Sequence, residues 1–358
     1  MRDASSVDRV RRTLLLTAPL ALSASLLGCT RPQPALGDPA GGLAAALAAG
    51  DRSAFLSRFA SGAGPQALAA RVYANLSRRD ATARPTPRIV TSGLDRLLVS
   101  WGYPDEAEVH SVAGVRSANG LITDLAPLST GTEWLADLQS VRTEPRLTVV
   151  APDESVLTRW WTAALAGLSA LASVAPQGLR SAGPLLVLVP TDVLAFGRYA
   201  GAGADRVAAV TVVPGSADSL GFRVVVNPRT LEDRDAAATI THEAVHAAMG
   251  SPRLTATPGW LLEGIAESLT ARAHRFVADA NRALAREAIA SGLPSSLPNT
   301  GTGDPGSYAL AELAVGAMVQ QIGWAAVLDE ARRRSGTSGR IDDRQILTWY
   351  RDSLAGLG

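Results

Sequence analysis

The sequence predicts an α+β fold built from two domains, and three observations support this prediction. Residues 43–144 start with helix-like segments and continue with strand-like ones. From residue 145, short apolar runs of strand length alternate with helical segments, and the remainder of the chain shows only helical patterns. We therefore expect a small α+β domain over residues 43–144. A second domain is expected over residues 145–358, with a small sheet followed by a group of helices.

The N-terminus has the features of a signal peptide. Three arginines, Arg9, Arg11 and Arg12, precede an uncharged stretch over residues 13–27. This stretch is too short to span a bilayer as a mature helix. A positive segment, a short apolar segment and a small residue before the cleavage point together predict a signal peptide over residues 1–28.

Cys29 is the only cysteine in the chain and directly follows this predicted signal. The segment resembles a bacterial lipoprotein signal, which implies cleavage before Cys29 and a diacylated thiol. The lipid would then anchor the protein in the cell membrane, on the extracytoplasmic face. The alternative is an ordinary secretory signal with a coincidental cysteine. In either case a single thiol excludes an intramolecular disulfide.

The region after the cysteine is expected to connect the lipid to the folded part of the chain. Residues 29–42 are rich in proline and glycine, which predicts a tether. In the small α+β domain, nothing reads as catalytic. The segments predicted there are the helices 43–49, 53–59 and 65–76 and the strands 97–101 and 108–112.

The second domain begins with alternating strands and helices. Its predicted strands are 147–150, 185–189, 207–213 and 222–226, and its predicted helices are 155–172 and 191–199. Asn227-Pro228 ends the last of these strands. The helices that follow carry the residues of chemical interest.

The most informative motif is the pentapeptide His242-Glu243-Ala244-Val245-His246. The whole chain has only four histidines, and two of them stand four residues apart around a glutamate. The alanine-rich flanks favour a helix that ends at Gly250. On a helix, residues four apart share a face, so both imidazoles could bind one zinc ion. Glu243 is then placed to accept a proton from the water on that zinc.

A third ligand is expected from the next helix, since zinc sites of this kind use three protein ligands. Thr257 could cap a helix whose first residue is Pro258. Glu263 and Glu267 then share a face of that helix. We assign Glu263 as the third zinc ligand and Glu267 as the acceptor of the free N–H of a ligating histidine. The alternative is that both glutamates are solvated helix residues.

These two segments, HEAVH and PGWLLEGIAESL, resemble the gluzincin peptidases, and most closely their compact peptidase MA-like branch. The resemblance covers roughly residues 146–350. It implies a zinc peptidase in which His242, His246 and Glu263 bind the metal and Glu243 is the base. The exopeptidase GxMEN strand of the clan's aminopeptidases is absent from the sequence, so nothing supports aminopeptidase specificity.

The same resemblance implies two further features. Gluzincins place an edge strand ahead of the zinc helix, along which an extended substrate lies. Residues 207–213 are the candidate for this strand, with an interior strand as the alternative. Gluzincins also use a tyrosine or histidine beyond the third ligand to stabilise the oxyanion. Tyr308 is the candidate here, with a packing role in the cleft wall as the alternative.

Composition narrows the choice of function. The net charge is +1, and no basic cluster is interleaved with aromatic residues, so nucleic acid is not an expected partner. The leading hypothesis is a lipid-anchored zinc endopeptidase that acts on peptide or protein substrates outside the cytoplasmic membrane. A zinc-bearing but proteolytically inactive binding lipoprotein is the second hypothesis, and a structural lipoprotein without metal is the third.

Overall fold

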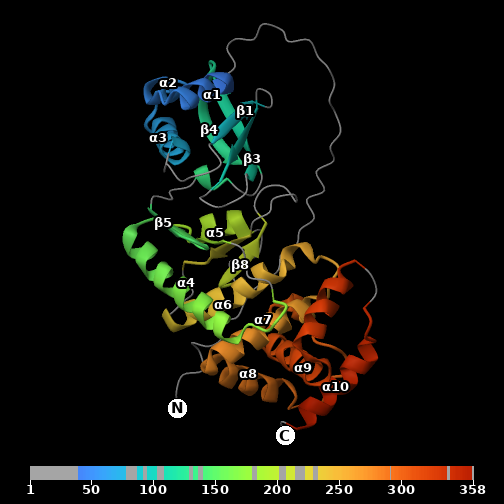
Figure 1. Cartoon of the computed structure of the whole chain (residues 1–358). Coiled ribbons are helices and arrows are strands. Elements are labelled where there is room, and N and C mark those ends of the chain that lie inside the picture. Colours follow the sequence, from blue (N-terminus) through green and yellow to red (C-terminus); the bar gives the residue numbers. More distant parts are fainter. Residues whose placement is uncertain are drawn as a thin grey trace. The chain divides into compact units, whose positions relative to one another are not determined.

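A computed structural model describes most of the chain, in two compact units (Figure 1). One unit lies within residues 16–139, and the other within residues 140–212 and 222–358. Cys29 and the predicted signal lie outside the described residues. The described ranges are 39–77, 87–91, 95–102, 109–128, 132–135, 140–179, 184–200, 207–213, 222–228, 233–290, 292–336 and 339–356.

The first unit combines three helices with a four-stranded antiparallel sheet. The helices are α1 (Pro39–Ala49), α2 (Arg52–Leu56) and α3 (Ala63–Ser77). The strands follow the order β1-β2-β3-β4 and are β1 (Arg88–Thr91), β2 (Arg96–Trp101), β3 (Val109–Ala118) and β4 (Leu121–Pro127). The start of α1 at Pro39 places four residues of the predicted tether in a helix.

Local sequence explains the hairpin that connects β3 to the edge strand β4. Asn119 and Gly120 join β3 to β4, and both have positive φ, 53° and 74°. Asparagine and glycine tolerate this conformation, which matches the twist of the paired strands. The alternating burial along β3 directs one face of the strand inward, where Trp134 donates a hydrogen bond of 2.8 Å to Ser111 Oγ.

The second unit contains a five-stranded mixed sheet with the order β5-β6-β7-β9-β8. Strands β6, β7 and β9 are parallel, while β5 and β8 run antiparallel to their neighbours at the two edges. The predicted strand at 207–213 therefore lies at an edge of the sheet. The strands are β5 (Ser140–Glu144), β6 (Leu147–Ala151), β7 (Leu185–Leu188), β8 (Ala209–Val212) and β9 (Arg223–Val226).

Helices complete this unit and account for most of its residues. After α4 (Glu154–Val174) and α5 (Val193–Ala200), the chain forms a helical group at its C-terminal end (Figure 1). The members of this group are α6 (Asp233–Met249), α7 (Gly259–Ala273), α8 (Arg275–Ala288), α9 (Pro305–Arg334) and α10 (Asp343–Ala355). The mixture of helices and sheets agrees with the predicted α+β class.

Two glycines allow the helices next to the candidate site to approach closely. A Cβ atom at Gly264 of α7 would overlap the carbonyl oxygen of Ala311 on α9. A Cβ atom at Gly167 of α4 would lie 2.7 Å from the carbonyl oxygen of Ala237 on α6. Because only glycine permits these contacts, α7 and α6 are each held against a neighbouring helix at a fixed distance.

The predicted cap of α7 is wrong. The helix begins at Gly259 with Pro258 at the N-cap, and no side chain caps it. Thr257 instead donates its hydroxyl to the carbonyl oxygen of Ala331 on α9, at 2.8 Å. The Thr257 hydroxyl, which the local sequence assigns to the start of the helix, forms a tertiary hydrogen bond instead.

Among the described residues, one helix, α9, is long and apolar enough to cross a membrane by length and composition. In this structure it packs against α7, α8 and α10. Its helical backbone is broken at Gly323, where φ is 77°. These contacts make α9 a core helix of the unit.

Candidate metal centre

Helix α6 carries three residues of the candidate site in the protein interior. His242 is 5% exposed, and Glu243 and His246 are fully buried. The four-residue spacing stacks the two imidazoles on one face, with ring centroids 4.8 Å apart. Gly250 ends α6 in the left-handed conformation, with φ of 70°, and the chain turns back toward α7.

Helix α7 brings Glu263 against both histidines. The Nε2 atoms of His242 and His246 lie 3.0 Å apart, and Glu263 Oε2 lies 3.2 Å and 3.4 Å from them, respectively. The three side chains form a buried group that could hold a metal ion. The structure therefore brings together the three residues that the sequence nominates as ligands.

The other ring nitrogens of the histidines face polar side chains. His242 Nδ1 lies 3.5 Å from Glu267 Oε1, and His246 Nδ1 lies 3.2 Å from Ser251 Oγ. A metal ion bound at Nε2 would leave Nδ1 as the nitrogen that carries the hydrogen. Such contacts fix the orientation and tautomer of a metal-binding imidazole. Glu267 thus lies where the sequence predicts an acceptor.

A residue of a third helix, α8, fixes the position of Glu267 by a hydrogen bond. Asn281 of α8 is 2% exposed and donates a hydrogen bond of 3.1 Å to Glu267 Oε2. The same amide nitrogen also contacts the carboxylate of Glu312 on α9. Helices α7, α8 and α9 therefore converge behind His242, which limits the movement of its ring.

The electrostatics of the group favour a cation. Burial opposes the charged form of His242, but the hydrogen bond to Glu263 and the charges of Glu267, Glu263 and Glu243 raise its pKa to about 9. Burial acts against the charged form of Glu263 as well, yet His246 and His242 hold the pKa of this carboxyl below its usual range. The surrounding carboxylates therefore stabilise positive charge at this point.

Glu243 is held at one oxygen and unpartnered at the other. Thr211 Oγ1 of β8 donates to Glu243 Oε2 at 2.6 Å and lies 3.1 Å from the carbonyl oxygen of Glu243. Glu243 Oε1 is buried and has no hydrogen-bond partner among the described residues. This oxygen is therefore open to accept a hydrogen bond or a proton from a molecule bound at the site.

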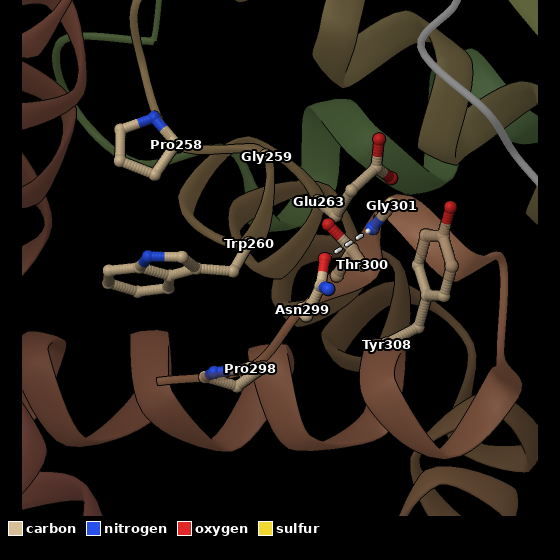
Figure 2. Close-up of a pocket in the computed structure, with 9 residues that line it drawn as sticks. All are labelled: Pro258, Gly259, Trp260, Glu263, Pro298, Asn299, Thr300, Gly301 and Tyr308. Atoms are coloured by element: carbon tan, nitrogen blue, oxygen red, sulfur yellow. Dashed lines mark hydrogen bonds between the residues drawn. The ribbon is translucent and has the colours of Figure 1, made fainter. Parts of the chain in front are cut away.

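Tyr308 lies in the first turn of α9, where Asp304 caps the helix by accepting a hydrogen bond of 2.8 Å from Ser307 N–H. The tyrosine is 1% exposed. Burial, followed by the charges of Glu263, Glu267 and Glu243, raises the pKa of its phenol. The hydroxyl therefore keeps its proton and remains a hydrogen-bond donor. Tyr308 and Glu263 line the same pocket (Figure 2).

Four residues of this arrangement are missing from the sequence-based prediction: Thr211, Ser251, Asn281 and Glu312. Ser251 lies only five residues after His246, and its position next to Gly250 is the one local signal that could have indicated a contact. Thr211 and Asn281 come from a strand and a helix whose packing against α6 and α7 is a tertiary feature.

Comparison of the chain with protein families, with characterised proteins and with solved structures gives no match. The chemistry and the geometry of the site are therefore the basis on which a function can be inferred.

Proposed function

We propose that the chain is a zinc metallopeptidase of gluzincin type that cleaves peptide bonds outside the cytoplasmic membrane. The observation that carries this proposal is the buried group of two imidazoles and one carboxylate, next to a glutamate with a free oxygen. Two histidines and a glutamate form a ligand set of catalytic zinc sites.

The dimensions of the group suit zinc. Bonds of about 2.0–2.1 Å to a tetrahedral zinc ion separate its ligand atoms by about 3.3 Å. The three donor atoms here are separated by 3.0, 3.2 and 3.4 Å. A zinc ion held by only these three protein ligands would remain open to water or substrate, as in catalytic rather than structural zinc sites.

The chain's own residues supply the proton transfers of the proposed reaction. When bound, zinc would acidify a water molecule and polarise the scissile carbonyl. Glu243 accepts the proton of the attacking water through Oε1, while Thr211 holds Oε2 and fixes the carboxylate plane. Glu243 then returns the proton to the leaving amine. The neutral hydroxyl of Tyr308 donates a hydrogen bond to the developing oxyanion.

The test is metal analysis of the purified domain starting after Cys29, followed by turnover of a casein-type substrate. One equivalent of zinc and measurable hydrolysis are expected. Zinc without hydrolysis of a broad peptide library would favour the inactive binding lipoprotein instead. A protein that contains no zinc and takes up none near neutral pH would exclude both and leave the structural lipoprotein.

Replacing Glu267 with alanine should lower zinc affinity by about 10–100-fold, because the ring of His242 loses its orienting carboxylate. The affinity is measured by competition with a chelator, and thermal unfolding confirms that the variant is folded. Glu287 is exposed on α8, so Glu287→Ala is the control and should bind zinc as the wild type does. Equal affinities in the two variants would assign Glu267 to packing alone.

Replacing Tyr308 with phenylalanine should reduce kcat by a factor on the order of 10 and leave zinc content unchanged. This is less than the ~10²–10³ lost with a sole oxyanion donor, because the metal shares the charge. Tyr350 is buried in α10 with a hydroxyl that has no hydrogen-bond partner among the described residues. Tyr350→Phe is therefore the matched control. An unchanged kcat for Tyr308→Phe would show that Tyr308 has only a packing role in the cleft wall.

Replacing Cys29 with serine should release the protein from the membrane or leave an uncleaved precursor, because acylation requires the thiol. Cell fractionation and incorporation of a labelled fatty acid measure the two effects. Thr30→Ala changes the next residue without removing the thiol and should behave as the wild type. If the wild type incorporates no lipid and partitions as the Cys29→Ser protein does, the proposed anchor is refuted.

A further inference from the structure

A pocket lies directly beside the candidate metal centre and shares two residues with it. Its volume is about 380 Å³, and Glu263 and Tyr308 form part of its wall. In Figure 2 the rings of Pro258, Trp260 and Pro298 gather on the side away from Tyr308. A pocket of this size falls within the range of ligand-binding pockets, about 300–1,000 Å³, and is large enough for one bulky side chain.

The remaining wall is formed by backbone and small side chains. Asn299 Oδ1 accepts a hydrogen bond of 3.1 Å from the N–H of Gly301, so this amide is already paired (Figure 2). A Cβ atom at Gly259 would lie 3.1 Å from Thr300 Oγ1, and one at Gly301 would lie 3.3 Å from Asn299 Oδ1. Both glycines line the pocket, and a side chain at either position would come into close contact with another lining residue.

The described residues that line the pocket offer no free counter-ion for a charged side chain. None of them is an arginine, a lysine or a histidine. The one carboxylate of the lining, Glu263, already contacts the imidazoles of His242 and His246. A charged group placed here would lose hydration without gaining a counter-ion, which costs free energy. An apolar side chain would instead gain by leaving water and by contact with the indole and prolyl rings.

We propose that this pocket is the subsite for one large uncharged side chain, aromatic or branched aliphatic, of the residue next to the bond that is cut. This inference rests on the proposed function, and it specifies the substrate class. The position of Glu263 and Tyr308 in both the pocket wall and the reaction site places a bound side chain adjacent to the scissile carbonyl.

The preference can be measured as binding, independently of turnover. The probes are N-acetyl amino-acid hydroxamates of phenylalanine, leucine, alanine, glutamate and lysine, whose common hydroxamate binds zinc and whose side chains differ. Calorimetry on the zinc-loaded protein should show phenylalanine and leucine binding at least ~10-fold more tightly than alanine, since even one methylene in a hydrophobic pocket is worth about 10–200-fold. Glutamate and lysine should bind no better than alanine.

A variant that fills the pocket tests whether the preference for large apolar side chains arises at this site. Gly301→Leu should reduce the advantage of phenylalanine over alanine by ~10-fold. Gly336 lies in open space after α9 and is exposed, so Gly336→Leu is the matched control and should retain the full preference. The wild-type series tests the preference even if Gly301→Leu fails to fold.

The outcomes separate this inference from the proposed function. Equal affinities for all five probes, or tightest binding of a charged probe, would overturn the subsite and leave the zinc site intact. A phenylalanine preference that survives in a folded Gly301→Leu protein would also overturn it, because another surface would then hold the side chain. Failure of every hydroxamate to bind would overturn the zinc site, and the subsite with it.

Discussion

The Glu243→Gln protein is expected to bind zinc as the wild type does and to hydrolyse peptides about 10²–10⁴-fold more slowly, the usual contribution of general acid–base catalysis. Glutamine preserves the size of the side chain, and its amide oxygen can still accept the hydrogen bond that Thr211 donates. It removes the buried carboxylate that would take the proton. Helix propensity hardly changes, because glutamate and glutamine are similar helix formers.

Two measurements on the same preparation test this expectation: zinc per protein by elemental analysis, and kcat on a fluorogenic peptide. Glu287→Gln makes the same chemical change at an exposed position of α8 and should retain full activity. A Glu243→Gln protein that turns over at the wild-type rate would rule out Glu243 as the base. Loss of zinc together with activity would mean that Glu243 supports the metal group rather than the proton transfer.

The candidate metal ligands His242, His246 and Glu263 could be predicted from the sequence, because their arrangement depends mostly on local spacing. His242 and His246 share a helix, and the four-residue spacing alone places their rings next to each other on one face. Glu263 and Glu267 likewise share a face of one helix, and a connection of about ten residues allows that helix to return. The structure places Glu263 Oε2 within 3.4 Å of both imidazoles.

The contacts that orient this group could not be predicted because they depend on tertiary packing. Thr211 reaches Glu243 only because β8 lies at the sheet edge against α6. Residue alternation identifies a strand, but it does not give the order of strands in a sheet. Asn281 of α8 donates a hydrogen bond to Glu267 of α7, and nothing in the sequence near Asn281 indicates this contact.

The failed cap at Thr257 illustrates the same limit. A threonine before a proline is a good local start signal for a helix. In the folded unit the carbonyl oxygen of Ala331 lies within reach, and the hydroxyl of Thr257 donates to it. Because Thr257 is only 6% exposed, this bond satisfies a buried group at both ends. Local preference was therefore overridden by burial.

The His246→Ala protein is expected to lose zinc and, with it, all measurable hydrolysis. Four-ligand zinc sites bind with about 10–16 kcal/mol, so one ligand corresponds to roughly 10²–10³-fold in affinity. This exceeds the effect expected for Glu267→Ala, which changes only the orientation of a ligand. His246 is fully buried, and its removal also deprives Glu263 of one of its two imidazole partners.

Chelator competition gives the zinc affinity, and circular dichroism confirms the fold. His110 is exposed on β3, so His110→Ala is the control and should keep one equivalent of zinc. A folded His246→Ala protein with wild-type affinity would show that other residues bind the metal, and the proposed ligand set would have to be abandoned.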